Sequence, residues 1–252
     1  MVIQLISFPF CVRFTKRIRD FRIREICRII EHSEADFIMF SPHALRSKMD
    51  LEHLNFCLSK QKAIALFEIK KSLGLSGNRL YLLRDRELIS MNPIGQLFSS
   101  ANEASKDMVS SLIGELESDG RTFVVGDKKF LVIQCGENNI LKGSSGVAEF
   151  RFGQYAELKK RFESVLRNVD VILNPVHTYW RRNGHFKSRI RKFSDKKRYC
   201  FSCTQMVDNQ LTKARKSPTQ NTTHIAMYNK KLISPVYTNS EEDYLVQTYN
   251  ID

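Results

Sequence analysis

The sequence has 252 residues, 42% of them hydrophobic, and its 40 Lys and Arg against 27 Asp and Glu give a net charge of +13. A chain of this length can bury a sizeable core without disulfide or metal support, and no apolar run is long enough to span a bilayer. The short apolar start at residues 1–7 has neither a basic flank nor a cleavage-type site, so a cytoplasmic location is expected. The positive charge favours a polyanionic partner or an acidic protein surface.

The predicted elements alternate between short apolar runs and amphipathic stretches, which is typical of a layered α/β protein. Strands are predicted at residues 2–7, 36–40, 63–68, 79–83, 88–91, 130–134, 169–174, 199–204, 224–228, 232–236 and 244–250. Helical periodicity indicates helices around residues 23–30, 108–116, 155–166 and 186–193. Consecutive strand pairs at 79–91 and 224–250 predict a mixed sheet, and the whole chain, 1–252, is interpreted as one domain.

Six cysteines, at 11, 27, 57, 135, 200 and 203, are expected to be thiols in a reducing compartment. Cys200 and Cys203 form a lone CxxC without a second pair, and they are interpreted as two thiols on a core strand. The sequence has no glycine-rich phosphate loop and no metal-ligand spacing, so neither a cofactor nor a metal site is predicted.

The segment around Cys135 carries the strongest chemical signal. A β-rich run stops at Gln134, Gly136 permits a sharp turn, and Glu137 suits the first turn or cap of a helix. A thiol between a strand end and a helix start lies where backbone N–H groups can lower its pKa and hold an oxyanion. The alternative is a buried structural cysteine at the end of a core strand.

The run Val-Ile-Gln-Cys135-Gly-Glu137-Asn138 resembles the nucleophile motif of the nitrilase, or carbon–nitrogen hydrolase, superfamily. Further segments match the family's strands in the right order, and together they extend over nearly the whole chain: residues 35–40, 78–83, 170–175 and 223–252. The resemblance implies a four-layer αββα sandwich, with the layers completed when two protomers pack together. It also implies a homodimer, or a subunit of an assembly, and cleavage of a small amide or nitrile through a thioester.

The family uses a Cys nucleophile, a Glu base and a Lys that stabilises the oxyanion. Where the Glu should follow the second strand, this sequence has Pro42 or, with a slip of one residue, His43. The run that should contain the Lys, residues 91–97, has none, and Pro93 or a neighbour takes its place.

The sequence therefore predicts Cys135 as the thiol nucleophile, His43 as a substitute base and Glu137 as a supporting residue. A second family Glu, in the loop before the nucleophile, could be any of three residues: Glu103, Glu115 or Glu117. Three functions remain open: a divergent amide or nitrile hydrolase, a catalytically inactive scaffold or binding subunit, and a basic nucleic-acid-associated protein.

Residues 181–216 form a basic segment with interleaved aromatic residues, among them Phe186 and Phe193. This composition could bind nucleic acid, an acidic partner or an anionic substrate. In the alternative interpretation, Phe186, Ile190 and Phe193 form the core face of a surface helix, and the cations lie in solvent. Residues 208–221 are predicted to be a basic surface loop, and no membrane partner is expected.

Overall fold

A computed structural model describes residues 1–11, 13–69, 78–91, 95–144, 146–177, 183–206, 223–241 and 243–252. The helices are α1 (Lys16–His32), α2 (Lys48–Cys57), α3 (Lys106–Glu117), α4 (Ala156–Arg167) and α5 (Asn183–Phe193), with a short 3-10 helix, η1 (Cys135–Ile140). The strands are β1 (Val2–Ser7), β2 (Phe37–Phe40), β3 (Ile64–Ile69), β4 (Arg79–Arg84), β5 (Glu87–Ser90), β6 (Thr122–Val125), β7 (Lys128–Val132), β8 (Leu141–Ser144), β9 (Val147–Phe150), β10 (Val171–Val176), β11 (Tyr199–Thr204), β12 (His224–Tyr228), β13 (Lys231–Leu232), β14 (Tyr237–Ser240) and β15 (Leu245–Asn250).

Two large mixed sheets form the centre of the protein. The first has the strand order β14-β15-β1-β2-β3-β4-β5 and the second β13-β12-β11-β10-β7-β6, while β8 and β9 form a separate hairpin. In the first sheet β1, β2 and β3 are parallel, and in the second β7, β10 and β11 are parallel. The prediction of a mixed two-sheet architecture is therefore confirmed.

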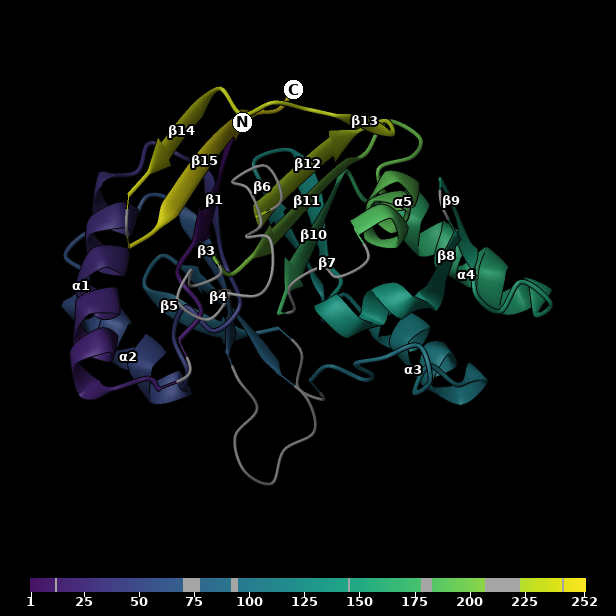
Figure 1. Ribbon diagram of the computed structural model, residues 1–252, viewed down its shortest axis with the longest axis horizontal. Coiled ribbons are helices and arrows are strands. Elements are labelled where there is room, and N and C mark those ends of the chain that lie inside the picture. Colours follow the sequence, from purple (N-terminus) through teal and green to yellow (C-terminus); the bar gives the residue numbers. More distant parts are fainter. Residues whose placement is uncertain are drawn as a thin grey trace, which may run out of the picture.

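The sheets pack face to face, and helices cover both outer faces (Figure 1). Ile3 and Phe37 of the first sheet lie in the core between the sheets, together with Val132 and Leu173 of the second. Helices α1 and α2 cover the first sheet, and α3, α4 and α5 cover the second. All four layers belong to a single chain, so the expectation that two protomers complete them was wrong. The reason is that the chain itself supplies both sheets, one mainly from residues before 91 and the other from residues after 121.

The strands could be predicted from the sequence because their side chains are buried on both faces of each sheet. Along β1, Ile3 and Leu5 face the other sheet, whereas Ile6 faces α1 and α2. Side chains of a strand alternate between its faces, and both faces here are apolar, so the strand is a nearly continuous hydrophobic run.

Some predicted elements need correction. The strand predicted at 232–236 is instead β13, paired with β12 in the second sheet, followed by β14 in the first. Pro235 lies between them, where the chain crosses from one sheet to the other, and its missing N–H suits this break. Helix α2 and the strands β6, β8 and β9 were not predicted. Helix α2 leaves Met49 and Phe56 exposed, so its apolar residues do not form one face.

The carboxyl ends of the parallel strands from both sheets meet at one end of the sandwich. There Pro9, after β1, and Met206, after β11, form a parallel bridge between the sheets. Ligands of α/β proteins commonly bind at such an edge. Among the described residues, no helix has the length and apolar character needed to cross a membrane.

Candidate functional site

Cys135 begins η1 at the carboxyl end of β7, as the sequence predicted for the strand-to-turn junction. Its side chain is half-buried. Gly136 is packed so closely against the chain at 98–99 that a Cβ there would lie 2.3 Å from the Phe98 carbonyl oxygen. Asn138 donates to Asn174 on β10 (2.7 Å), which fixes the turn to the neighbouring strand. The thiol is therefore held on a rigid turn.

His177 follows β10 directly and is hydrogen-bonded to Cys135 through both its side chain and its backbone. Its Nε2 lies 2.8 Å from Oε1 of Glu68, whose side chain is fully buried on β3 of the other sheet. The three residues form a Cys–His–Glu chain that links the two sheets. Neither Glu68 nor His177 was predicted from the sequence as a site residue. A signal was present at Glu68, because a carboxylate inside the buried run Leu66-Phe-Glu-Ile69 requires a partner.

Within the Cys135–His177–Glu68 triad, neighbouring charges shift the pKa values of Cys135 and His177 toward their charged forms. Burial acts to raise the pKa of the Cys135 thiol, but the hydrogen bond and positive charge of His177 outweigh it, and the pKa is lowered. For His177, burial acts to lower the pKa, but the Glu68 carboxylate and the Cys135 thiolate raise it to about 10. The site therefore stabilises a thiolate beside an imidazolium.

Polar side chains hold Glu68 and His177 in place. Gln134 Nε2 donates to Glu68 Oε1 (2.5 Å), and the Asn78 side-chain amide lies 2.7 Å from His177 Nε2. Oε2 of Glu68 is buried, and it has no hydrogen-bond partner among the described residues. One carboxylate oxygen is thus used to hold the imidazole, and the other faces no donor within the described part of the chain.

His43, predicted as a substitute base, lies in the turn after β2 with a left-handed φ of 59°. Its ring centroid is 4.9 Å from that of His177, and its backbone N–H donates to the backbone carbonyl of Glu68 (2.8 Å). The structure thus brings His43 to the site as a neighbour of His177. The imidazole that is hydrogen-bonded to the Cys135 thiol belongs to His177.

Glu137, predicted as a supporting residue, is fully buried and accepts from both Arg121 Nη1 (2.8 Å) and Nη2 (2.9 Å). The same carboxylate accepts from the backbone N–H groups of Gln134 (3.0 Å) and Leu97 (3.1 Å). It therefore pins the turn that contains Cys135. Arg121 is also fully buried and forms a second ion pair with Glu115 at 2.7 Å.

Of the three glutamates considered for the second family Glu, only Glu115 belongs to this network among the described contacts. Glu103 accepts from Ser99 and Ser100, and Glu117 pairs with Arg161. Pro93, at the predicted Lys position, and the proposed loop at 208–221 lie outside the described residues.

The described part of the basic segment includes α5. Ile190 and Phe193 are fully buried in the core under the second sheet, with Phe186 packed against it, which confirms the predicted core face. Cys200 and Cys203 are buried on β11, as expected of two core thiols.

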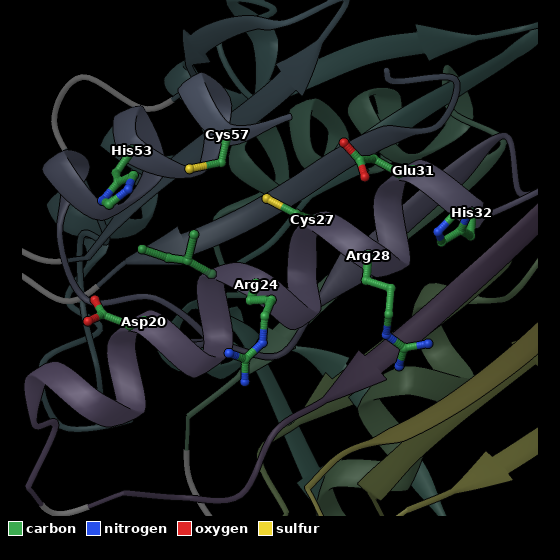
Figure 2. Close-up of a pocket in the computed structure, with 9 residues that line it drawn as sticks. Asp20, Arg24, Cys27, Arg28, Glu31, His32, His53 and Cys57 are labelled. Atoms are coloured by element: carbon green, nitrogen blue, oxygen red, sulfur yellow. The ribbon is translucent and has the colours of Figure 1, made fainter. Parts of the chain in front are cut away.

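A groove on the outer face of α1 and α2 contains further thiols (Figure 2). Cys27, Cys57, His53 and Glu31 are among its lining residues. Burial, together with Cys57 and Glu31, raises the pKa of Cys27 to about 11, which is opposite to what a nucleophile needs. The Cys135 site is therefore the stronger candidate for reactive chemistry.

Comparison with solved structures identifies the architecture. The chain superposes on an amidase of the nitrilase superfamily from Nesterenkonia AN1 with a TM-score of 0.56 at 8% identity, covering 99% of this chain and 90% of that one. A carbon–nitrogen hydrolase superfamily protein from Xanthomonas campestris, solved with an arsenic adduct in its active site, gives 0.56 at 10% identity, with coverage of 99% and 90%. The chain has the nitrilase-superfamily fold.

A carbon–nitrogen hydrolase from Helicobacter pylori G27 has the same nitrilase fold, with a TM-score of 0.54 at 10% identity and coverage of 98% of this chain and 88% of that one. Neither a protein-family model nor the sequence of a curated protein matches this chain. Since the identities are this low, the chemistry of this nitrilase-fold protein has to be argued from its own residues.

Proposed function

We propose that this protein is a cysteine-dependent hydrolase of non-peptide C–N bonds, with Cys135 as nucleophile, His177 as proton carrier and Glu68 as the residue that orients His177. The observation that carries the proposal is the continuous chain of hydrogen bonds from Cys135 through His177 to Glu68. The nitrilase fold, shared with a solved amidase and a solved carbon–nitrogen hydrolase, supports the same class of substrate.

The first half of the reaction uses the thiolate–imidazolium pair. The Cys135 thiolate attacks the amide carbon, a C–S bond forms, and the carbonyl electrons move to oxygen. The tetrahedral intermediate then collapses as the C–N bond breaks, and His177 gives its proton to the departing nitrogen. The products of this half are a thioester on Cys135, a free amine or ammonia, and neutral His177.

The second half restores the site. Neutral His177 takes a proton from water, and the resulting hydroxide adds to the thioester carbon. The C–S bond breaks with its electrons on sulfur, so a carboxylic acid leaves and the thiolate–imidazolium pair returns. Glu68 supports both halves, because its carboxylate, 2.8 Å from Nε2, stabilises the imidazolium.

This assignment replaces the family's Glu and Lys with a different pair. The carboxylate comes from β3 instead of from the turn after β2, and the cation beside the thiol is an imidazolium. The catalytically inactive alternative predicts that Cys135 has no special reactivity. The close pairing of Cys135 with His177 favours the active hypothesis.

The test measures turnover of a panel of small amides and nitriles and, on the same samples, the rate of alkylation of Cys135 by iodoacetamide. Cys135→Ala should abolish turnover, and His177→Gln should lower kcat by about 10²–10⁴-fold. Because burial then acts unopposed, His177→Gln should also move the midpoint of Cys135 alkylation to higher pH. Exposed Cys57 serves as the internal reference thiol for alkylation, and Cys57→Ala is the control variant for turnover, which it should leave unchanged. If Cys135 alkylates no faster than Cys57, or turnover survives Cys135→Ala, the proposal is wrong.

A further inference from the structure

Two arginines lie beside the nucleophile turn, and both are tied to Asn139 of η1. Arg189 Nη1, from α5, donates to the Asn139 side-chain oxygen (2.9 Å). Arg151 Nε, from the residue after β9, donates to the Asn139 carbonyl (2.6 Å). The Asn139 amide in turn donates to the carbonyl of Gly136 (2.8 Å), the residue that follows the nucleophile. The two guanidinium groups are thus fixed to the same turn as Cys135.

These two cations are poorly compensated. Both side chains are only partly exposed, and among the described residues neither guanidinium is paired with a carboxylate. Nε of Arg189 is buried, and it has no hydrogen-bond partner in the described part of the chain. Burial lowers the pKa of both residues, and the charge of Arg151 lowers that of Arg189 further. Two adjacent half-buried charges of the same sign are unfavourable unless an anion joins them.

Arg189 is close enough to Cys135 for their charges to interact. A negative charge on the Cys135 thiolate raises the pKa of Arg189, against the effects of burial and of Arg151. An anionic group held by Arg189 would therefore lie near the thiolate, and the rest of the same molecule could reach the sulfur. A planar guanidinium binds carboxylate or phosphate oxygens through two hydrogen bonds.

We propose that Arg189 and Arg151 form an anion subsite of the Cys135 centre, and that the substrate is a small amide or nitrile with a carboxylate or phosphate group near the scissile bond. This inference rests on the proposed function for the identity of the scissile bond. It assigns anion binding to Arg189, a single residue of the basic segment at 181–216, whereas the sequence predicted anion binding for the segment as a whole.

The first experiment compares two alkylating reagents of nearly equal size, iodoacetate with its carboxylate and neutral iodoacetamide. The ratio of their rates at Cys135, divided by the same ratio at Cys57, measures recognition of the anion independently of intrinsic thiol reactivity. We expect this normalised ratio to fall by about tenfold or more in Arg189→Gln, a change worth about 1.4 kcal/mol, and to fall in Arg151→Gln as well. Arg161→Gln removes one surface charge on α4, where Arg161 pairs with Glu117, and should leave the ratio unchanged.

A second experiment distinguishes phosphate from carboxylate as the bound anion, and tests how far the anion site lies from Cys135. Inorganic phosphate and dicarboxylates of increasing length are added as competitors, and their protection of Cys135 against iodoacetamide is measured in the wild type and in Arg189→Gln. In parallel, turnover of monoamides of dicarboxylic acids is compared with that of neutral amides of equal chain length. A wild-type preference for the anionic member that disappears in Arg189→Gln supports the subsite, and the better competitor identifies the anion.

The two proposals fail differently. Rapid alkylation of Cys135 by iodoacetamide, with an unchanged ratio in both arginine variants and no protection by either anion, overturns the subsite and leaves the nucleophile standing. If Cys135 does not alkylate, the proposed function fails, and binding of phosphate and glutarate is then measured by calorimetry at constant ionic strength. Binding that is lost in Arg189→Gln and kept in Arg161→Gln supports an anion site, and absence of binding to the wild type overturns it.

Discussion

The Nε2 atom of His177 lies 2.8 Å from Oε1 of Glu68, and this contact is one of those that join the second sheet to the first at the end of the sandwich where Cys135 lies. Neither residue belongs to β7, the strand that leads to Cys135: Glu68 is on β3, and His177 follows β10. The reactive geometry therefore depends on how the two sheets pack, as well as on the turn that presents the thiol.

Glu68→Gln should lower the pKa of the His177 imidazole from its value of about 10, because the neutral amide no longer stabilises the imidazolium. Because the pKa of His177 is higher in the folded than in the unfolded protein, its protonation stabilises the fold. This contribution is fully present below the unfolded-state pKa of about 6.5 and is lost as pH rises through about 10. The variant should therefore lose less stability between neutral and alkaline pH than the wild type. Titration of the His177 ring by NMR, together with urea unfolding from pH 6 to 10, checks both effects, and an unchanged pKa contradicts them.

Gly136→Ala should destabilise the protein by about 1–3 kcal/mol through overpacking. The new Cβ would lie 2.3 Å from backbone atoms at Phe98 and Ser99, and these cannot turn aside as a flexible side chain can. Gly114→Ala, in the interior of α3 with nothing within 4 Å of the new Cβ, is the matched control. It should stabilise the protein by about 0.5–1 kcal/mol. Urea unfolding of both variants measures the difference, and equal effects would contradict this account of the turn.

Arg121→Met should cost about 3–5 kcal/mol, because it leaves the fully buried Glu137 carboxylate without its cation. Adding Glu137→Gln to that variant removes the stranded charge and should recover part of the loss. A double-mutant cycle by urea unfolding gives the coupling between the two residues. A cost below about 1 kcal/mol for Arg121→Met would show that the pair does not support the turn that contains Cys135.

His224 should make the protein less stable at acidic pH. Its Nε2 lies 2.7 Å from the Ser7 hydroxyl and its Nδ1 3.1 Å from Gln247 Oε1, and burial lowers its pKa to about 3. Between pH 6.5 and 3 the unfolded chain binds a proton at this residue and the native state does not. The free energy of unfolding should therefore fall as pH drops through this window, by at most about 1.4 kcal/mol per unit from this residue. His224→Gln should make the fall shallower; identical slopes for variant and wild type between pH 7 and 4 would refute the assignment.

Much of the fold could be predicted because its determinants are local. Strands such as β1 and β10 are buried on both faces and are therefore apolar runs, and α4 has its buried residues at helical spacing. Helix α2 was missed because little of its signal is hydrophobic. Its start is defined by the capping box of Ser47 and Asp50, and only Leu51 and Leu54 among its apolar residues are buried. Its exposed Phe56 obscures the periodicity.

The site was predictable only at Cys135, where a strand end, a glycine and a capping carboxylate follow one another in sequence. Glu68 was placed correctly at the end of a strand, but its partner comes from the other sheet. His177, after the Asn174-Pro175 pair, gave no local sign of that pairing. Such a contact arises from the packing of two sheets, which no spacing along the chain encodes. The family resemblance directed attention to the turn after β2, and hence to His43.

The antiparallel pairing of β1 with β15, which joins Val2 to Asn250, also has a consequence for biosynthesis. During translation β15 is made after every other strand of the sandwich, so one edge of β1 lacks its partner until then. Formation of this pair requires the chain to close its longest loop, a step that is entropically costly and slow. Until it closes, the apolar strand β1 presents unpaired backbone groups, and nascent chains stalled before residue 245 should be the species that chaperones bind and that aggregate most readily.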